Sequence, residues 1–395
     1  MTDLLYSEIE DELRAGTRAM LADRARWNAV LEHAREGRAP YDPELWRVLA
    51  TEMGLAGLIV PESLGGAGAS LREAAVVCEE LGRVVAPVPF LGSAVVATAT
   101  VLAAAGDDPS GPVAELLTAL AAGERTAALV VPFSTIPFTA TLPAATRSAP
   151  NPAAGAVGAT GPGPYPVFSV ADGALTGSAR NVADAIGADV LLVPATDGLY
   201  AVPGDAGGVT RDAVVSLDIT RPITDVTLDR ATGTLLAAGA HGAEATRVGL
   251  GAGAALLASE QLGIAEACLE QTVAYLKGRY QFGRPIGSFQ GLKHRAADLW
   301  VSITQARAAA RHAAVCVATG DPDAVVATAI AQAHCSLVAV KAAEENVQMH
   351  GGIGFTWEHP AHLYLKRAKV TAIAFGTPDR HLLALAELLH LPTAG

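Results

Sequence analysis

Two short segments in the last third of the chain combine residues suited to holding a large anion. The first runs Arg279-Tyr-Gln-Phe-Gly-Arg-Pro-Ile-Gly-Ser-Phe-Gln290, and the second runs Gln348-Met-His-Gly-Gly-Ile-Gly-Phe355. Arg279 supplies a permanently charged planar fork whose donors match a phosphate. Gly351 and Gly352 have no side chains, so main-chain N–H groups can approach a bulky charged ligand there. The spacing alone indicates a phosphate or dinucleotide ligand, and a surface arginine beside a plain helix end is the alternative.

Several other site classes are disfavoured by the sequence. No GxGxxG fingerprint follows a first strand, so a Rossmann nucleotide site is not supported. The formal charge of −12 disfavours non-specific binding of nucleic acid. The cysteines are widely spaced with no CxxC pair, which favours buried thiols in a reducing compartment over disulfides or a zinc site. These cysteines are Cys78, Cys268, Cys316 and Cys335.

The chain is expected to be cytoplasmic and to lack a membrane span. Its first residues carry acidic side chains and do not have the form of a signal peptide. The uncharged stretch 84–106 is interrupted by Pro87, Pro89 and Gly92, and its remainder is mostly Ala, Val and Thr. A membrane span needs about 20 strongly apolar residues, so we expect a buried helix in this stretch.

The segments that must position the two motifs fall into three regions, which predict an α+β chain. Residues 1–122 are expected to form an N-terminal helical domain, in which Asp42-Pro43 is a helix start and Ser70 with Glu73 is a capping box. Residues 123–241 contain short β-type runs and are expected to form a small antiparallel sheet domain. Within them, the stretch 148–166 is rich in Pro, Gly and Ala and predicts a mobile loop.

Residues 242–395 return to helical patterns and are expected to form a C-terminal four-helix bundle. We expect one helix through residues 252–277, and three more over about 289–318, 323–347 and 378–390. Both anion-binding motifs lie at ends of these helices.

The chain resembles the acyl-CoA dehydrogenase family of flavoproteins over nearly its whole length. The likeness is strongest in ArgxxPheGly at 279–283, in Gln290, and in GlnxxGlyGlyxGly at 348–354. It implies an N-terminal helical domain, a middle β-domain and a C-terminal four-helix bundle. It also implies α,β-dehydrogenation of an acyl-CoA thioester, in which FAD accepts the β-hydride and a carboxylate base removes the α-proton.

The resemblance assigns the cofactor-binding residues one by one. In this family the two motifs reach across a dimer interface and hold the FAD of the neighbouring subunit. Arg279 would meet the pyrophosphate, Phe282 would pack beside the ring systems, and Gln290 and Gln348 would hydrogen-bond to the cofactor. Further positions matched to FAD contacts are Gly351, Gly352 and Thr377.

The chain departs from the family at the catalytic base. The usual Glu stands directly before Gly-Thr, where this chain has Phe375. Some members carry the Glu on the first helix of the bundle, where the matching position here is close to Gly253. Glu260 lies two helical turns further along that helix, so it is a weak candidate for a displaced base. A solvated or ion-paired helix Glu is the alternative for Glu260.

The middle domain departs as well. The family's ThrGluPro…GlySerAsp loop is replaced by residues 131–136, and its Trp-Ile-Thr-Asn segment is matched by residues 181–184. The resemblance therefore implies a subunit that keeps the half-site it lends to a neighbour and has lost part of its own. The implied partners are an acyl-CoA, an electron acceptor such as an electron-transfer flavoprotein, and a second copy or a homologous subunit in a mixed tetramer. The alternatives are a non-redox scaffold, and a flavin enzyme of a biosynthetic pathway that needs no carboxylate base.

Overall fold

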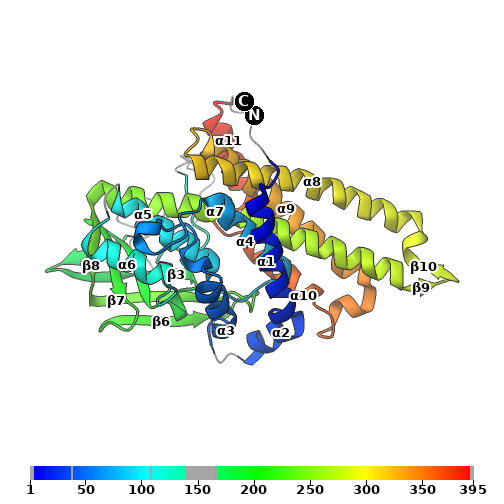
Figure 1. Cartoon of the computed structure of the whole chain (residues 1–395), viewed down its shortest axis with the longest axis horizontal. Coiled ribbons are helices and arrows are strands. Elements are labelled where there is room, and N and C mark those ends of the chain that lie inside the picture. Colours follow the sequence, from blue (N-terminus) through cyan, green and yellow to red (C-terminus); the bar gives the residue numbers. More distant parts are fainter. Residues whose placement is uncertain (1–3, 37–38, 107–108, 139–164, 166, 392–395) are drawn as a thin grey trace, which may run out of the picture.

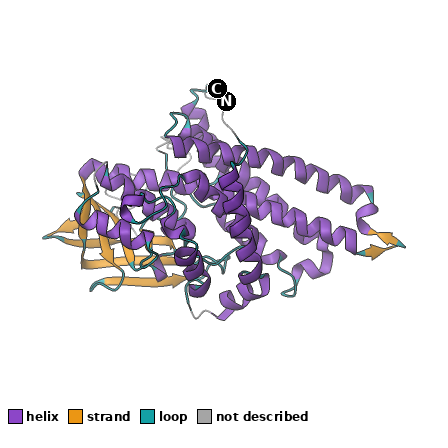
Figure 2. Ribbon diagram, in the orientation of Figure 1, coloured by secondary structure: helices purple, strands orange, loops and turns teal. Residues whose placement is uncertain are grey.

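The protein has a helical N-terminal part, a β-rich middle part and a long helical C-terminal part (Figure 1). The computed structural model describes residues 4–36, 39–106, 109–138, 165 and 167–391. The predicted loop over 148–166 therefore lies outside the described residues, except for Tyr165. The strands gather at one end of the molecule and the long helices extend from it to the other end (Figure 2). This order of helices, sheets and helices confirms the predicted fold class.

Two of the N-terminal helices, α3 and α4, begin where the sequence predicts. Asp42 caps the helix that starts at Pro43, and Ser70 and Glu73 form a reciprocal capping box. The next helical stretch starts with η4 (Phe90–Ala97), continues into α5, and is buried as expected. The helices of this part are α1 (Glu8–Arg24), α2 (Trp27–Glu36), α3 (Pro43–Arg47), α4 (Leu71–Val84), α5 (Thr98–Ala105) and α6 (Gly111–Ala121).

The middle part contains two four-stranded sheets, where a single antiparallel sheet was expected. One sheet has the order β1-β4-β5-β8, and its β1 and β4 run parallel with Ala127 opposite Val190. The second sheet is antiparallel, with the order β2-β3-β7-β6. Strand pairing between distant segments leaves no local signal, so the sequence did not reveal the division. The strands are β1 (Ala127–Leu129), β2 (Ser169–Ala171), β3 (Ala174–Ala183), β4 (Val190–Ala195), β5 (Gly198–Pro203), β6 (Val209–Val214), β7 (Ile223–Thr232) and β8 (Thr234–Ala238).

The C-terminal part is built on α7, a single helix of 40 residues that runs from the β-region to the far end of the molecule. At that end a short hairpin turns the chain back into α8. One helix, α10, was not predicted, because it is short and follows a glycine-rich turn. The elements are α7 (Gly239–Gly278), β9 (Tyr280–Gln281), β10 (Arg284–Pro285), α8 (Gln290–Thr319), α9 (Ala324–His350), η8 (Gly351–Phe355), α10 (Ala361–Thr371) and α11 (Pro378–Leu388).

Glycines let α4 and α7 pack with their backbones nearly in contact. A Cβ built on Gly263 of α7 would lie 1.9 Å from the carbonyl oxygen of Glu79, and one on Gly82 of α4 would lie 2.1 Å from that of Glu260. No side chain at these positions avoids such a clash without separating the helices. The abundance of Gly and Ala in the chain thus reflects close helix packing.

We expect Gly263→Ala to lower the free energy of unfolding by about 1–3 kcal/mol, because overpacking forces the helices apart. Gly251 is the control, since it lies on the same helix and a Cβ built there meets nothing within 4 Å. Gly251→Ala should stabilise by about 0.5–1 kcal/mol through lower backbone entropy. Urea unfolding of both variants checks this, and a loss of stability equal in the two would contradict the packing argument.

Two described helical segments, Gly239–Gly278 and Ala324–Phe355, are long and apolar enough to span a membrane by length and composition. Their most apolar windows are 89% and 56% buried inside the fold, respectively. In this structure both helices serve as the core of the helical part. The four cysteines are all buried and unpaired, as predicted.

Candidate active site

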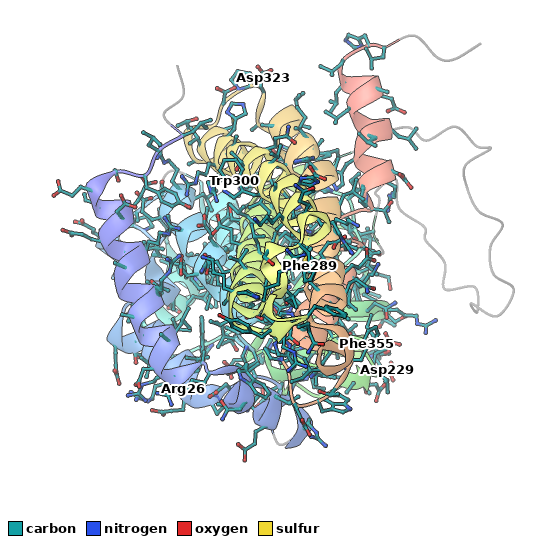
Figure 3. The ribbon with its side chains drawn as sticks, turned by 90° about the vertical axis from the view of Figure 1, so that its right-hand side faces the viewer. Arg26, Asp229, Phe289, Trp300, Asp323 and Phe355 are labelled. Atoms are coloured by element: carbon teal, nitrogen blue, oxygen red, sulfur yellow. The ribbon has the colours of Figure 1, made fainter. Side chains whose placement is uncertain are left out.

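The fold brings the two predicted anion-binding motifs to one end of the helical part. The first motif ends α7 and starts α8, and the second ends α9, whose direction is the same as that of α7. Tyr275 and His350, one from each helix end, stack with ring centroids 4.4 Å apart. Figure 3 looks onto this end, where Phe289 and Phe355 mark the two motifs.

This end face is open and exposed. Phe282 is 91% exposed and Phe355 is 77% exposed, and Arg279, Gln290 and Gln348 are also exposed. A Cβ built on Gly351 or on Gly352 meets nothing within 4 Å, so the backbone there borders free space. The end face therefore offers a cation, amides and bare backbone to a ligand or partner outside the chain.

Phe282 at the tip of the hairpin is strained as well as exposed. Its φ of +52° lies in the left-handed region, which a bulky residue seldom adopts. An exposed aromatic ring in such a conformation gains nothing from the core of its own chain. Strain of this kind is more frequent at functional positions than elsewhere.

Thr377 lies elsewhere. It caps α11, where its hydroxyl accepts a hydrogen bond from the N–H of Arg380 at 3.5 Å. Figure 1 shows α11 far from the β9–β10 hairpin. One chain therefore does not bring Thr377 together with the other six predicted cofactor residues.

The segment before Thr377 is packed tightly against two segments of the middle part. The N–H of Phe375 donates to the carbonyl oxygen of Phe133 at 2.7 Å, and the N–H of Phe133 donates to that of Asn181 at 2.8 Å. The rings of Phe133 and Phe375 meet edge to face, with centroids 5.4 Å apart. Ile136 lies so close that a Cβ on Gly376 would be 3.3 Å from it. The three segments 133–136, 181 and 375–376 thus contact one another directly, and the Phe375 N–H is not free for a ligand carbonyl.

Both sequence positions at which the family places a base meet in this closed region. A Cβ built on Gly253 would lie 2.7 Å from the ring of Phe375. One position therefore carries an apolar ring, and the other carries no side chain, which makes room for that ring. Neither residue can take a proton.

Glu260 is held in a buried ion-pair network. Its two carboxylate oxygens accept from Arg221 at 2.7 Å and from Arg367 at 2.9 Å. Burial alone would raise the pKa of Glu260, but the attraction and hydrogen bonds of the two guanidinium groups outweigh it and lower the pKa. A carboxylate so paired is a poor base. These contacts support the ion-paired alternative for Glu260 over the displaced base.

A second buried carboxylate, which the sequence did not single out, faces the closed region. Asp184 lies beside a cavity of about 30 Å³ that Phe133, Arg221 and Phe375 also line. Within the described part of the chain, the Asp184 carboxylate makes no hydrogen bond or ion pair. Burial raises its pKa to about 6, although Arg221 and Arg367 pull the pKa down. A cavity of this size holds a water molecule or two, and no ring system.

We expect Asp184→Asn to stabilise the fold at neutral pH. Because the native state raises the pKa of Asp184 from 3.8 to about 6, folding favours the protonated form. The stability contributed by Asp184 is greatest below pH 4 and falls as the pH rises to about 6. Above pH 6 the Asn variant should therefore gain about 3 kcal/mol over wild type, and below pH 4 almost nothing.

Unfolding in urea at several pH values checks this expectation. Asp172 is the control, because it also has a positive φ, of +53°, but is exposed. Asp172→Asn should leave the stability at neutral pH nearly unchanged, because the side chain is exposed. A gain for Asp184→Asn that is the same at pH 4 and pH 8 would rule out the buried charge as its cause.

The comparisons with known proteins agree with this geometry. Residues 7–124 match the family model "Acyl-CoA dehydrogenase, N-terminal domain", and residues 240–390 match "Acyl-CoA dehydrogenase, C-terminal domain". The chain is 35% identical to "Acyl-CoA dehydrogenase IpdE2" of Mycolicibacterium smegmatis, over 94% of this chain and 96% of that protein.

Solved structures show the same fold. A variant of the "Tcur3481-Tcur3483 steroid ACAD" superposes with a TM-score of 0.79 at 27% identity, covering 97% of this chain and 98% of the other. The ChsE4-ChsE5 complex from Mycobacterium tuberculosis superposes with a TM-score of 0.81 at 24% identity, covering all of both chains (100% each). The chain therefore belongs to the acyl-CoA dehydrogenase family, whose members are FAD-dependent oxidoreductases.

Proposed function

We propose that this chain acts in FAD-dependent dehydrogenation of an acyl-CoA thioester as a subunit that completes the FAD site of a neighbouring, homologous subunit. The neighbour carries the catalytic Glu that this chain lacks. Electrons then pass to an external acceptor of the electron-transfer flavoprotein type. The observation that carries the proposal is the contrast between the open end face and the closed centre, by which we mean the packed region around Phe133, Asn181 and Phe375.

The residues of the end face fit FAD, and those of the centre do not. At the end face, Arg279 and the bare backbone of Gly351 and Gly352 border free space. At the centre, backbone hydrogen bonds join Phe375 to Phe133 and Phe133 to Asn181, and the cavity beside them, of about 30 Å³, is too small for a flavin ring. The chain thus fits one part of a shared FAD site, the part that reaches toward the neighbour.

In this assembly FAD supplies the acceptor for the β-hydride of the substrate. Arg279 holds the negative charge of the pyrophosphate through charge-assisted hydrogen bonds. The amides of Gln290 and Gln348 would hydrogen-bond to the cofactor, and Phe282 would cover its ring systems and exclude water from them. The contribution of this chain is to bind and orient the cofactor, while proton abstraction belongs to the neighbour.

The composition of a related solved structure supports a mixed assembly. The solved structure at 27% identity carries two protein names, Tcur3481 and Tcur3483, and is called a steroid ACAD. An acyl-CoA with a large, fused-ring acyl group is accordingly the substrate class to test first. The aromatic residues on the end face also favour a protein partner, since exposed aromatic clusters mark interaction surfaces.

The test is flavin content and flavin affinity. The chain purified alone should lack stoichiometric FAD, and the chain co-expressed with a Glu-bearing homologue should be yellow. In that assembly Arg279→Ala should weaken FAD binding about tenfold or more, because a charge-assisted contact contributes about 1.5–3 kcal/mol. Lys277, exposed on the last turn of the same helix, is the control, and Lys277→Ala should have little effect. If FAD affinity is unchanged in Arg279→Ala, Arg279 does not bind the pyrophosphate.

A further inference from the structure

The β9–β10 hairpin and the helix ends beside it form a cluster of positive charge in an acidic chain. Between Glu270 and Asp298 the sequence has five lysines and arginines and no acidic residue, whereas the whole chain has a formal charge of −12. All five side chains are exposed. They are Lys277, Arg279, Arg284, Lys293 and Arg295, and we call the segment 277–295 that carries them the cationic hairpin. The function proposed above uses only Arg279 among these cations.

Within the cationic hairpin, only Arg295 has an acidic partner among the described residues. It pairs with Glu345 at 2.5 Å, and the other four cations form no ion pair in the part of the chain that the structure describes. By contrast, the exposed Arg247 on α7 is paired with Glu244. Like charges without a counter-charge repel one another, so the cluster destabilises the single chain unless an anion from outside neutralises it.

The β-rich end of the molecule, opposite the cationic hairpin, is acidic. Figure 1 shows the hairpin at one tip of the molecule, and Figure 2 shows the strands of both sheets at the other end. Residues 167–238 contain nine aspartates and four arginines, with no lysine or glutamate, so their formal charge is −5. Six of these aspartates are exposed, against two of the arginines. The molecule is therefore positive at one tip and negative at the other.

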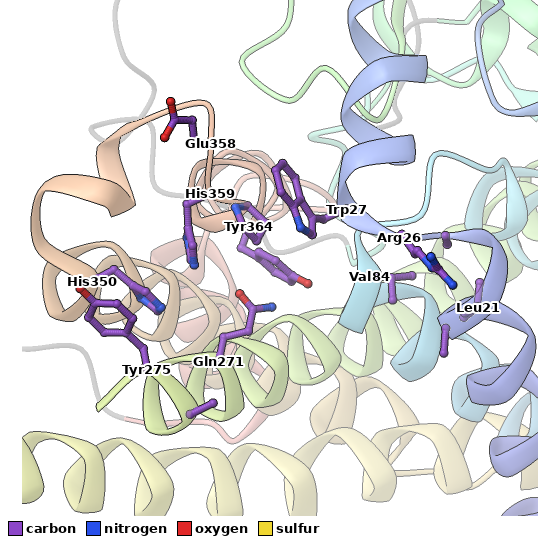
Figure 4. Close-up of a pocket in the computed structure, with 14 residues that line it drawn as sticks. Leu21, Arg26, Trp27, Val84, Gln271, Tyr275, His350, Glu358, His359 and Tyr364 are labelled. Carbon is purple, nitrogen blue, oxygen red and sulfur yellow. The ribbon is translucent and has the colours of Figure 1, made fainter. Parts of the chain in front are cut away.

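Stacked rings hold the base of the cationic hairpin in place. Tyr275 lies two residues before Lys277 and stacks on His350 with centroids 4.4 Å apart, and His350 stacks on His359 at 4.1 Å (Figure 4). Burial lowers the pKa of His350, and burial with repulsion from His350 and His362 lowers the pKa of His359 to about 4. Both imidazoles are neutral at physiological pH, so the charge of the cluster comes from its lysines and arginines. A surface held on packed rings is preorganised, which lowers the entropic cost of binding.

The side chains of the cationic hairpin have the composition of a protein contact. The guanidinium of Arg284 lies 4.0 Å from the ring centroid of Phe289, and the ring of Phe282 meets the same ring edge to face at 6.1 Å. Lys277 on α7 and Lys293 on α8 flank these rings. Aromatic residues and arginine are enriched at protein interfaces, and charges at the rim steer the encounter. A nucleic acid is disfavoured as the partner by the acidic charge of the whole chain.

The two charged ends favour one arrangement of a pair of homologous subunits. Subunits that pair about a twofold axis make reciprocal contacts, so each offers the other the same kind of surface. In an antiparallel pair the cationic hairpin of each subunit meets the acidic middle part of the other, and both charges are neutralised. A parallel pair would place the two cationic clusters together, and juxtaposed like charges are repulsive.

We propose that the cationic hairpin docks on an acidic surface in the middle part of the neighbouring homologous subunit, and that this charge contact speeds and orients assembly. The identity of the neighbour rests on the function proposed above. The charge contact itself depends on Lys277, Arg284 and Lys293, which that function does not use. Complementary charge raises the rate of association more than the affinity, and salt screens it.

The test is the rate at which this chain associates with a Glu-bearing homologue, measured by stopped-flow fluorescence. We expect the rate to fall about tenfold or more between about 20 mM and about 500 mM salt. At the lower salt concentration, the double variant Lys277→Ala, Lys293→Ala should associate about fivefold more slowly than wild type, with a weaker salt dependence. The FAD affinity of the assembled pair should not change in this variant.

A double variant of two paired cations is the control. Arg247→Ala with Lys369→Ala removes the same net charge, but these cations are already paired in their own chain, with Glu244 and Glu344. Its association rate should stay within about twofold of that of wild type, because steering depends on where the charge lies. An equal loss of rate in both double variants would show that only net charge matters, and the docking proposal would be wrong.

Carbodiimide cross-linking of the co-expressed assembly locates the contact, because it joins a lysine amine directly to a carboxylate that touches it. We expect Lys277 or Lys293 to be joined to an acidic residue in the middle part of the homologue, as identified by mass spectrometry. Cross-links from these lysines only to other parts of the homologue, or none, would overturn the proposal. Binding of the single chain to phosphatidylserine vesicles that is lost in Lys277→Ala, Lys293→Ala would assign the surface to a lipid instead.

The outcomes also separate this proposal from the function on which it rests. An assembly whose FAD affinity depends on Arg279, but which forms at a rate independent of salt, keeps the cofactor role and excludes the charge contact. An assembly that forms with the expected salt dependence, but contains no flavin, keeps the charge contact and excludes the cofactor role. A salt-sensitive dimer of this chain that excludes the homologue would make a second copy the occupant and overturn the proposal.

Discussion

Turnover of an acyl-CoA by this chain alone should lie at least about 10²–10⁴-fold below that of its assembly with a Glu-bearing homologue, since the missing general base by itself removes that factor. Phe375 occupies the usual base position, and the alternative position is close to Gly253. Among the described residues, the cavity beside Phe375 measures about 30 Å³, which is too small for a flavin ring. The measurement is reduction of an artificial electron acceptor with a panel of acyl-CoAs, steroid-derived ones included.

The Phe375→Glu variant tests whether the missing base or the closed site prevents turnover by the chain alone. In the chain alone this variant should remain inactive, because the N–H of residue 375 stays bonded to Phe133 and Ile136 still fills the space. Full turnover by the wild-type chain alone would refute the half-site function. A chain that binds no flavin and is inactive both alone and together with a Glu-bearing homologue would favour the scaffold alternative. A yellow but inert assembly would favour a repurposed flavin enzyme.

Glu260→Gln should lower the free energy of unfolding by about 3–5 kcal/mol, because it removes the ion-pair partner of the buried Arg221 and one of the two ion-pair partners of the buried Arg367. Arg221 comes from the loop before β7, and Arg367 comes from α10, so Glu260 joins the β-region to the helical part. Arg367 is also paired with Asp218 at 2.5 Å. The measurement is chemical unfolding followed by circular dichroism.

Glu244 provides the control for this substitution. It lies on the same helix and pairs with Arg247, but both side chains are about half exposed, at 52% and 50%. Glu244→Gln should cost about 0.5 kcal/mol or less, as is typical of exposed pairs. If the assembly carrying Glu260→Gln loses turnover while its stability is unchanged, Glu260 is a base after all.

The sequence predicted those features that have a local signal. The cap at Asp42 and the capping box at Ser70 each depend on residues within one turn, and both helices start there. The two motifs of the end face could be recognised in the sequence because each consists of adjacent residues, whereas their proximity became visible only in the fold. An ion pair was one of the two roles weighed for Glu260, but the sequence could not identify its partners because they are distant, with Glu260 and Arg367 separated by 107 positions. The contact between Gly253 and Phe375 is likewise visible only once α7 and the last turn are packed together.

The exposed rings of the end face should affect how long an unpartnered copy of the chain survives in the cell. Tyr280, Phe282 and Phe355 are 62%, 91% and 77% exposed in the single chain. Quality-control proteases and chaperones recognise apolar side chains of this kind, so a copy without a partner is expected to be cleared. If the chain pairs with a homologous subunit as proposed, two subunits made in unequal amounts would be reduced to equal numbers, and the surface proposed to complete the cofactor site would also set the ratio of the two subunits.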